Sequence, residues 1–146
     1  MNVFSALDIS STGLTAQRQR IEVISSNLAN AGTTRTADGG PYRRKDLVFE
    51  STTPDNPFAQ ALGSALGEDQ EAGVRVIEIY EDASPFLRKY EPNHPDADAD
   101  GYVSYPNVNP IEEMVNLLSA TRSFEANTQA VNAIKEIAAK SMEIGK

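Results

Sequence analysis

The sequence predicts an α+β chain, with long N- and C-terminal helices that pair as a coiled coil and a small β-rich middle domain. Three observations support this prediction. No Gly or Pro interrupts residues 111–144, apolar side chains recur every seven residues near both ends of the chain, and the segment between them is rich in Gly, Pro and β-branched residues. A seven-residue apolar repeat indicates a left-handed coiled coil, and alternating β-branched runs indicate strands.

The C-terminal helix has a clear start and a clear end. Asn109 is a good N-cap, Pro110 suits the first helical position, and Glu112 is placed to complete a capping box. Gly145 is the expected stop. A helix of this extent is roughly 50 Å long, which is too long for the core of a small domain.

The predicted seam of this helix consists of two rows with a spacing of seven: Leu117, Phe124, Val131 and Ala138, and then Ala120, Asn127, Ile134 and Ser141. Met114 extends it toward the start of the helix. Asn127 and Ser141 are polar at positions where an isolated coiled coil carries Leu or Ile, and such residues fix register at a cost in stability. One long core-facing helix is the alternative interpretation.

The N-terminal segment Asn2–Ala31 has the same period. Its rows are Leu7, Leu14, Ile21 and Leu28, and then Val3, Ser10, Gln17, Ile24 and Ala31. Gly13 weakens this helix by up to about 1 kcal/mol and permits a bend. The two helices could form a hairpin within one chain, but two helices alone cover only one side of each other. We therefore expect them to need partners.

The middle of the chain predicts strands at residues 42–49, 73–80, 86–90 and 101–105. The predicted domains are a discontinuous helical coiled-coil domain of residues 1–31 plus 110–146, and a β-rich middle domain of residues 32–109 with a mobile loop at 51–72. The basic run Arg43, Arg44 and Lys45 is interpreted as a solvated strand edge, and a contact with an acidic partner is the weaker alternative.

Composition excludes several classes of function. The net charge is −8, and residues 51–109 hold three of the basic residues but eleven of the acidic ones, so a nucleic-acid interface is not expected. The chain has no Cys, which removes thiol catalysis, Cys-based zinc sites and disulfides. No apolar run reaches the length of a membrane span, and the start does not read as a cleaved signal peptide.

One stretch resembles a metal site. Asp96, Asp98, Asp100 and Gly101 match the opening of an EF-hand loop, but Asn107 stands where a bidentate Glu is needed. Pro92 and Pro95 also prevent an incoming helix. An acidic turn that caps a strand is the favoured interpretation, and a calcium-binding module is the alternative.

The remaining chemistry is sparse. His94 is the only histidine, and no phosphate loop or nucleophile–base pattern accompanies it. The sequence therefore predicts no enzyme, no cofactor and no metal.

Several stretches resemble the flagellar basal-body rod proteins, and among these the proteins of the proximal rod. They lie in family order at residues 8–20 (DISSTGLTAQRQR), 26–34 (SNLANAGTT), 40–44 (GPYRR), 92–103 (PNHPDADADGYV), 105–109 (YPNVN) and 122–127 (RSFEAN). The SNLAN signature is typical of rod and hook proteins in general, and the HPDAD and YPNVN stretches indicate the proximal rod. Residues 51–72 match least.

The resemblance implies a structural subunit of the proximal rod, assembling through its terminal helices into an axial tube that transmits torque and encloses the export channel. Implied partners are other rod proteins, copies of the chain in a helical assembly, and the flagellar type III export apparatus. The implied location is the basal body in the periplasmic space, reached without a cleaved signal peptide or membrane insertion. A soluble helical adaptor of a secretion system is a further alternative.

The candidate interface residues are those of the helix seams: Leu7, Leu14, Ile21, Leu28, Leu117, Phe124, Val131 and Ile134. Asn27 and Asn30 are expected to hold the junction below the first helix. The polar seam residues Asn127 and Ser141 suggest a hypothesis, namely that they keep lone subunits from sealing their own seams until neighbours arrive.

Overall fold

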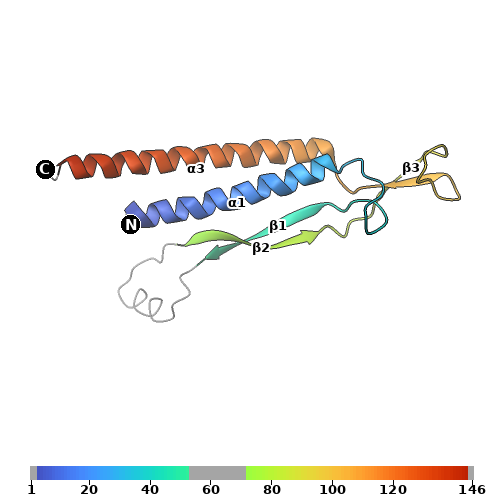
Figure 1. Ribbon diagram of the computed structural model, residues 1–146, viewed down its shortest axis with the longest axis horizontal. Coiled ribbons are helices and arrows are strands. Elements are labelled where there is room, and N and C mark those ends of the chain that lie inside the picture. The colour runs from blue at the N-terminus through green and yellow to red at the C-terminus, as the bar shows by residue number, and fades with distance from the viewer. Residues whose placement is uncertain (1–2, 53–71, 145–146) are drawn as a thin grey trace. The chain divides into compact units, whose positions relative to one another are not determined.

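The computed structural model describes residues 3–52 and 72–144 and has the predicted α+β composition (Figure 1). Its elements, in chain order, are α1 (Val3–Ala29), β1 (Lys45–Thr52), β2 (Gly73–Glu81), β3 (Leu87–Tyr90), β4 (Tyr102–Tyr105) and α3 (Pro110–Ile144). Within the described ranges, neither helix has a stretch that is both long and apolar enough to cross a lipid bilayer.

Helix α3 starts where its capping residue predicts. The Asn109 side-chain oxygen accepts a hydrogen bond from the Ile111 N–H at 3.1 Å, and its carbonyl accepts from the Glu113 N–H at 3.0 Å. The first bond satisfies a donor that a helix start leaves without an intrahelical partner, and the second is the first backbone hydrogen bond of the helix. The predicted stop at Gly145 lies outside the described residues.

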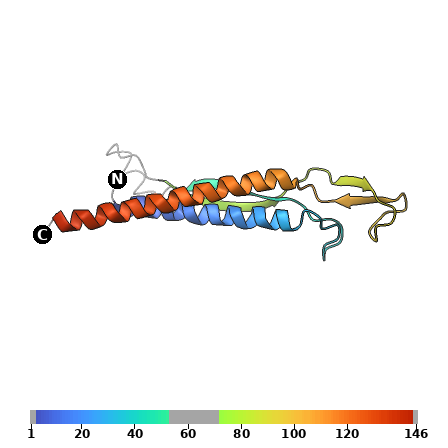
Figure 2. The ribbon, with the colours of Figure 1, turned by 90° about the horizontal axis from the view of Figure 1, so that it is seen from above.

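The strands form two separate two-stranded sheets, β1 with β2 and β3 with β4. Strands β3 and β4 run antiparallel, with Leu87 opposite Tyr105 and Tyr90 opposite Tyr102, and Figure 2 shows the two arrows side by side. A two-stranded sheet is marginal in water, so each pair depends on packing against other segments.

The predicted first strand is displaced. Residues 42–44 are not in β1, because the Tyr42 N–H donates to the Thr33 carbonyl at 3.1 Å and the Arg44 N–H donates to the Asn107 side-chain oxygen at 2.9 Å. Strand β1 then continues to Thr52, so residues 51 and 52 of the predicted mobile loop are strand. Residues 53–71 of that loop lie outside the described residues.

The chain divides into two compact units. The described part of the first unit comprises residues 3–19, 49–52, 72–77 and 121–144. In this unit α1 contacts both other elements: a Cβ added at Gly13 would lie 3.1 Å from Asn127 Nδ2 of α3, and the Val74 N–H of β2 donates to Thr12 Oγ1 at 3.2 Å. Helix α1 is therefore covered on two sides here, by α3 and by the strand pair (Figure 1).

The second unit comprises residues 20–48 and 78–120. Its apolar core includes Ile24, Val103 and Ala120, and Val103 on β4 is fully buried. Asn27 and Glu113 are buried with them, at 0% and 1% exposure. The division predicted from sequence, with the helical ends as one domain and residues 32–109 as another, stays a prediction.

The two predicted rows of α3 lie on its less exposed face, except for Ser141. Ala120 is buried, and Leu117, Phe124, Asn127, Val131, Ile134 and Ala138 are half-buried. Met114 and Ser141 are exposed in the single chain, so their placement in this seam stays a prediction. Glu113, one residue before Met114, takes the buried position instead.

Candidate functional site: a buried polar junction

The second unit contains a cluster of polar side chains that hydrogen-bond to one another, formed by Asn27, Tyr42, Arg44, Asn107 and Glu113. We call it the junction cluster. Its members come from the last turns of α1, the loop before β1, the loop after β4 and the first turns of α3. Buried polar groups need hydrogen-bond partners, so the cluster holds these four segments in one arrangement.

Asn27 uses the full capacity of its side chain. Its Nδ2 donates to the Lys45 carbonyl at 2.8 Å and to Glu113 Oε2 at 3.2 Å. Its Oδ1 accepts from the Lys45 N–H at 2.9 Å and from the Tyr42 hydroxyl at 3.0 Å. Asn27 thereby pairs with the backbone at the start of β1 as a strand neighbour would, and it ties that strand to both helices.

Glu113 and Arg44 form the charged pair of the cluster. Arg44 Nε donates to Glu113 Oε1 at 2.7 Å, and Arg44 Nη1 donates to Asp46 Oδ2 at 3.0 Å. Burial opposes the charge on Arg44, but the hydrogen bonds to Glu113 and Asp46 outweigh it, so the pKa of the guanidinium lies above its ordinary value. Removing one partner of a buried ion pair strongly destabilises a protein, because the remaining buried charge is left without a partner.

Asn107 connects the cluster to the turn between β2 and β3. Its Oδ1 accepts from the Arg44 N–H at 2.9 Å, and its Nδ2 donates to the Asp82 carbonyl at 3.1 Å. Hydrogen bonds from the Ser84 hydroxyl and N–H, with a smaller contribution from the nearby Arg44 charge, lower the pKa of the Asp82 carboxyl. The turn is thus fixed by its own polar groups as well as by Asn107.

The structure gives the two predicted junction residues different positions. Asn27 is at the centre of the cluster, whereas Asn30 bonds locally: its Nδ2 donates to the Ser26 carbonyl at 2.9 Å, and its Oδ1 accepts from Thr33 Oγ1 at 3.2 Å. Asn30 therefore shapes the turn after α1.

The eight predicted seam residues are all half-buried, and none is a member of the junction cluster: Leu7, Leu14, Ile21, Leu28, Leu117, Phe124, Val131 and Ile134. Their role as an assembly interface stays a prediction.

Sequence reasoning missed four members of the cluster. Tyr42 was predicted only as the first residue of a strand. The interpretation of Arg44 as part of a solvated strand edge was wrong, because its guanidinium is largely buried against Glu113. Asn107 stands at the twelfth position of the EF-hand match and within the YPNVN stretch, and neither pattern predicts a partner within the chain. One signal was available for Glu113, since it lies seven residues before Ala120 and so belongs to the same row of the predicted seam.

The acidic stretch of residues 96–100 forms a turn rather than an open ligand set. Asp98 Oδ1 accepts from the Asp100 N–H at 3.0 Å and from the Tyr102 N–H at 2.8 Å, which begins β4. Bonds from these backbone groups, with the Tyr102 N–H first, lower the pKa of Asp98. The favoured interpretation, an acidic turn that caps a strand, agrees with this geometry, and Gly101 in this turn has a left-handed φ of 80°.

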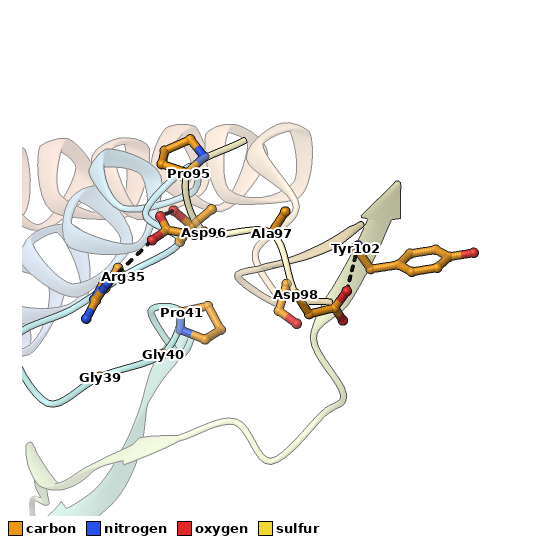
Figure 3. A pocket seen from close by; sticks show the side chains of 11 residues that line it. Arg35, Gly39, Gly40, Pro41, Pro95, Asp96, Ala97, Asp98 and Tyr102 are labelled. Carbon is orange, nitrogen blue, oxygen red and sulfur yellow. Dashed lines mark hydrogen bonds and ion pairs between the residues drawn. The ribbon is translucent and has the colours of Figure 1, made fainter. Parts of the chain in front are cut away.

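The same turn borders an open groove of about 480 Å³ (Figure 3). Asp96 on one rim accepts from Thr34 Oγ1 at 2.8 Å and lies 3.8 Å from Arg35 Nη1. Asp98 accepts from Arg88 as well as from the backbone. Nowhere in residues 3–52 and 72–144 do three or more His, Asp or Glu side chains gather closely enough to hold a metal ion. Asp96 and Asp98, two of the three carboxylates that suggested calcium, thus bond to other groups of the protein.

Glu91 and Tyr105 provide a test of the β3–β4 pair by pH. The Tyr105 hydroxyl donates to Glu91 Oε2 at 2.8 Å; this bond lowers the pKa of Glu91 and raises that of Tyr105. The stabilisation from Glu91 is present above the ordinary carboxyl pKa of about 4.3 and is lost as pH falls through the lowered one. The stabilisation from Tyr105 is present below the ordinary tyrosine pKa of about 10. It is lost as pH rises through the raised pKa of Tyr105.

The expected result is a Tyr105→Phe variant whose deficit in unfolding free energy is greatest at neutral pH and shrinks at both extremes. Urea unfolding of the two proteins across pH measures it. A deficit that does not change with pH would assign the effect of the substitution to packing instead of to the hydrogen bond.

Comparison with known proteins gives a consistent result over the whole chain. Residues 7–35 match the family described as flagella basal body rod protein, and residues 99–144 match the C-terminal region of flagellar basal body rod FlgEFG proteins. The flagellar basal-body rod protein FlgC of Bacillus subtilis is 47% identical, and that of Escherichia coli O157:H7 is 41% identical, each over the full length of both chains.

The FlgC protein of Borreliella burgdorferi is 45% identical over 99% of this chain and 98% of its own length. Both terminal helices and the junction cluster fall within these alignments. Membership of the rod family also places the chain among components that assemble with other rod proteins in the basal body. The chain belongs to the FlgC family of flagellar basal-body rod proteins and is a structural subunit of the proximal rod.

Proposed function

We propose that the chain assembles through α1 and α3 into the axial tube of the rod, which transmits torque and encloses the export channel, and that it carries out no catalytic step. The observation that carries this proposal is the second apolar face of α3. A helix with apolar residues on two faces is stable in water only when both are covered.

The outer face of α3 is apolar over its first three turns. Its residues are exposed by between 47% and 70%: Ile111, Met114, Val115 and Leu118. Glu113 and Ala120 lie on the buried face of the same turns. Ile111, Val115 and Leu118 follow the helical spacing of four and three, so they form one stripe. Contiguous exposed apolar stripes mark protein interfaces.

The proposed partners are copies of this chain and other rod proteins. Each subunit would present one surface to a different surface of its neighbour, and such heterologous contacts generate an open helical tube when the rotation does not close. The seam residues would pair the helices as a coiled coil, with Asn27 holding the junction below them. Passage through the flagellar type III export apparatus to the periplasmic space completes the proposal.

The direct test places a charge on the outer stripe. A Leu118→Asp variant should keep the circular dichroism of the parent but fail to support rod assembly and motility in a flagellated host that lacks its own copy. Gln129→Asp, at another exposed position of α3, is the matched control and should assemble normally. Normal motility of the Leu118→Asp strain would refute the use of this face.

A second test separates a rod subunit from a free-standing helical adaptor. Hydrogen exchange of the terminal helices should be faster in the purified chain than in isolated basal bodies, because neighbours cover them there. Helices that are equally protected in a purified chain that never enters basal bodies would favour the adaptor.

A substitution at Asn127 tests the hypothesis that polar seam residues keep the helices of a lone subunit from pairing fully before its neighbours arrive. The Asn127 amide lies against Gly13, so an Asn127→Leu variant removes a half-buried amide from the contact between α1 and α3. We expect the free chain to gain about 1 kcal/mol in unfolding free energy and the assembly to be impaired. Ser141→Leu is the control, because Ser141 is exposed and its hydroxyl bonds to the Ile137 carbonyl. Unchanged stability of the free Asn127→Leu chain would contradict the hypothesis.

A further inference from the structure

The chain contains two Asp-Gly dipeptides, at residues 38–39 and 100–101, and both lie in the same kind of turn. In each, the glycine N–H donates to the carbonyl three residues earlier, which belongs to Thr36 at 3.1 Å and to Asp98 at 3.0 Å. Both glycines have a left-handed φ, 84° for Gly39 and 80° for Gly101. The two sites are therefore a natural matched pair.

Their surroundings differ. A Cβ built at Gly39 would meet nothing within 4 Å, and Asp38 is exposed. Apart from the glycine N–H, the turn is closed by hydrogen bonds from the Thr36 N–H and hydroxyl to the Gly40 carbonyl, at 2.8 and 3.3 Å. Gly39 and Gly40 lie on the open rim of the groove, across from the acidic turn (Figure 3).

The second dipeptide is held from several sides. A Cβ at Gly101 would lie 2.9 Å from Tyr90 Cε2 and 3.3 Å from Pro92 Cβ. The Gly101 carbonyl accepts from the Glu91 N–H at 2.9 Å. The backbone N–H on either side of Gly101, those of Asp100 and Tyr102, both donate to Asp98 Oδ1. This turn cannot open without breaking these bonds together.

We propose that Asp38 is a site of spontaneous isomerisation to isoaspartate, and that the packing around Gly101 protects Asp100 from the same reaction. The Gly39 nitrogen attacks Cγ of the protonated Asp38 side chain, the N–Cγ bond forms, and the carboxyl hydroxyl leaves as water with the proton of the nitrogen. The product is a five-membered cyclic imide.

Water then opens the imide at one of its two carbonyls. Addition at Cγ breaks the new bond and restores aspartate. Addition at the main-chain carbonyl of Asp38 breaks the original peptide bond, and the chain then continues through the side-chain carbon, which is isoaspartate. The net change in mass and in charge is zero, and one methylene enters the backbone at the rim of the groove.

The fold decides the rate because the glycine nitrogen must leave its turn and its peptide plane must rotate. The turn at Asp38 is held by three hydrogen bonds, namely the one from the Gly39 N–H and the two from Thr36 to the Gly40 carbonyl. The turn at Asp100 is held by five, namely those from the Gly101 N–H, from the Asp98 N–H to the Tyr102 carbonyl, to Asp98 Oδ1 (two) and to the Gly101 carbonyl. Two additional hydrogen bonds reduce the population of the open turn by roughly tenfold or more. The native chain should therefore modify Asp38 at least about ten times faster than Asp100.

The experiment incubates the purified full chain at neutral pH and physiological temperature for several weeks. Isoaspartate is measured at each site by enzymatic isoaspartyl methylation with labelled methyl donor, followed by peptide mapping. A parallel sample in concentrated urea removes the fold. The expected result is a large excess of isoaspartate at residue 38 in the native sample and similar amounts at both sites in urea.

Equal rates at the two sites in the native chain, or protection of both, would overturn the proposal. Two variants check that the signal comes from the imide. Asp38→Glu should abolish the signal at residue 38, because the larger ring forms much more slowly, while Asp100→Glu should leave it unchanged. The absence of isoaspartate at residue 38 from both the native and the urea sample would likewise refute the proposal. This inference stands apart from the rod function, because it depends only on the turn.

Discussion

A Glu113→Ala substitution is expected to lower the free energy of unfolding by about 3 kcal/mol or more, which is a large part of the stability of a small protein. Glu113 is 1% exposed and takes hydrogen bonds from Arg44 and Asn27. Its removal leaves the Arg44 guanidinium without its buried acceptor, and it leaves Asn27 Nδ2 with one of its two acceptors. Arg44 keeps 23% exposure, so water compensates part of the loss.

Glu112→Ala is the matched control for this prediction, because it removes a carboxylate from the same turn at an exposed position. A change within about 0.5 kcal/mol is expected there. Glu113→Gln should fall between the two, since the amide oxygen still accepts a hydrogen bond but the charge is lost. Chemical unfolding followed by circular dichroism compares the three variants. Similar small losses for Glu113→Ala and Glu112→Ala would show that the junction cluster contributes little to stability.

The second large effect is expected at Gly101. A Gly101→Ala variant should lose about 2–3 kcal/mol, because the left-handed backbone costs roughly 1–2 kcal/mol for a residue with a Cβ and the new methyl group collides with Tyr90. The β3–β4 pair has only two strands, so it has little margin to absorb such a loss. Hydrogen exchange of the amides of residues 87–90 and 102–105 should accelerate accordingly.

Gly40→Ala separates the two contributions. Gly40 has a φ of 84°, but a Cβ there would meet nothing within 4 Å. It should show only the backbone cost of about 1–2 kcal/mol, and the difference between the two variants then measures the collision at Gly101. Equal losses in the two variants would mean that Tyr90 and Pro92 move aside without cost.

Periodicity predicted the helices well because each helix is long and its pattern repeats many times. The start of α3 at Asn109 and Pro110 follows from local capping chemistry, and the acidic turn before β4 follows from Asp98 and Gly101. These features depend on neighbours in the sequence, which one sequence displays directly.

The junction cluster was harder to predict because its members meet only in three dimensions. Arg44 looks solvated in a run of basic residues, and its acidic partner Glu113 lies far along the chain. A carboxylate in an apolar row also looks like an error in the pattern until its partner is known. For the same reason the apolar pattern favours Met114 over its neighbour Glu113.

The junction cluster also governs the order in which the chain can fold. Asn27 and Glu113, which share a hydrogen bond, are 86 residues apart in sequence. Helical turns form within microseconds from local contacts, whereas a contact of this separation must first close a long loop. A chain released from one end, from a ribosome or a narrow pore, cannot close the cluster until both segments are free. Until then it remains an open chain with nascent helices, and its last step of folding waits for its far end.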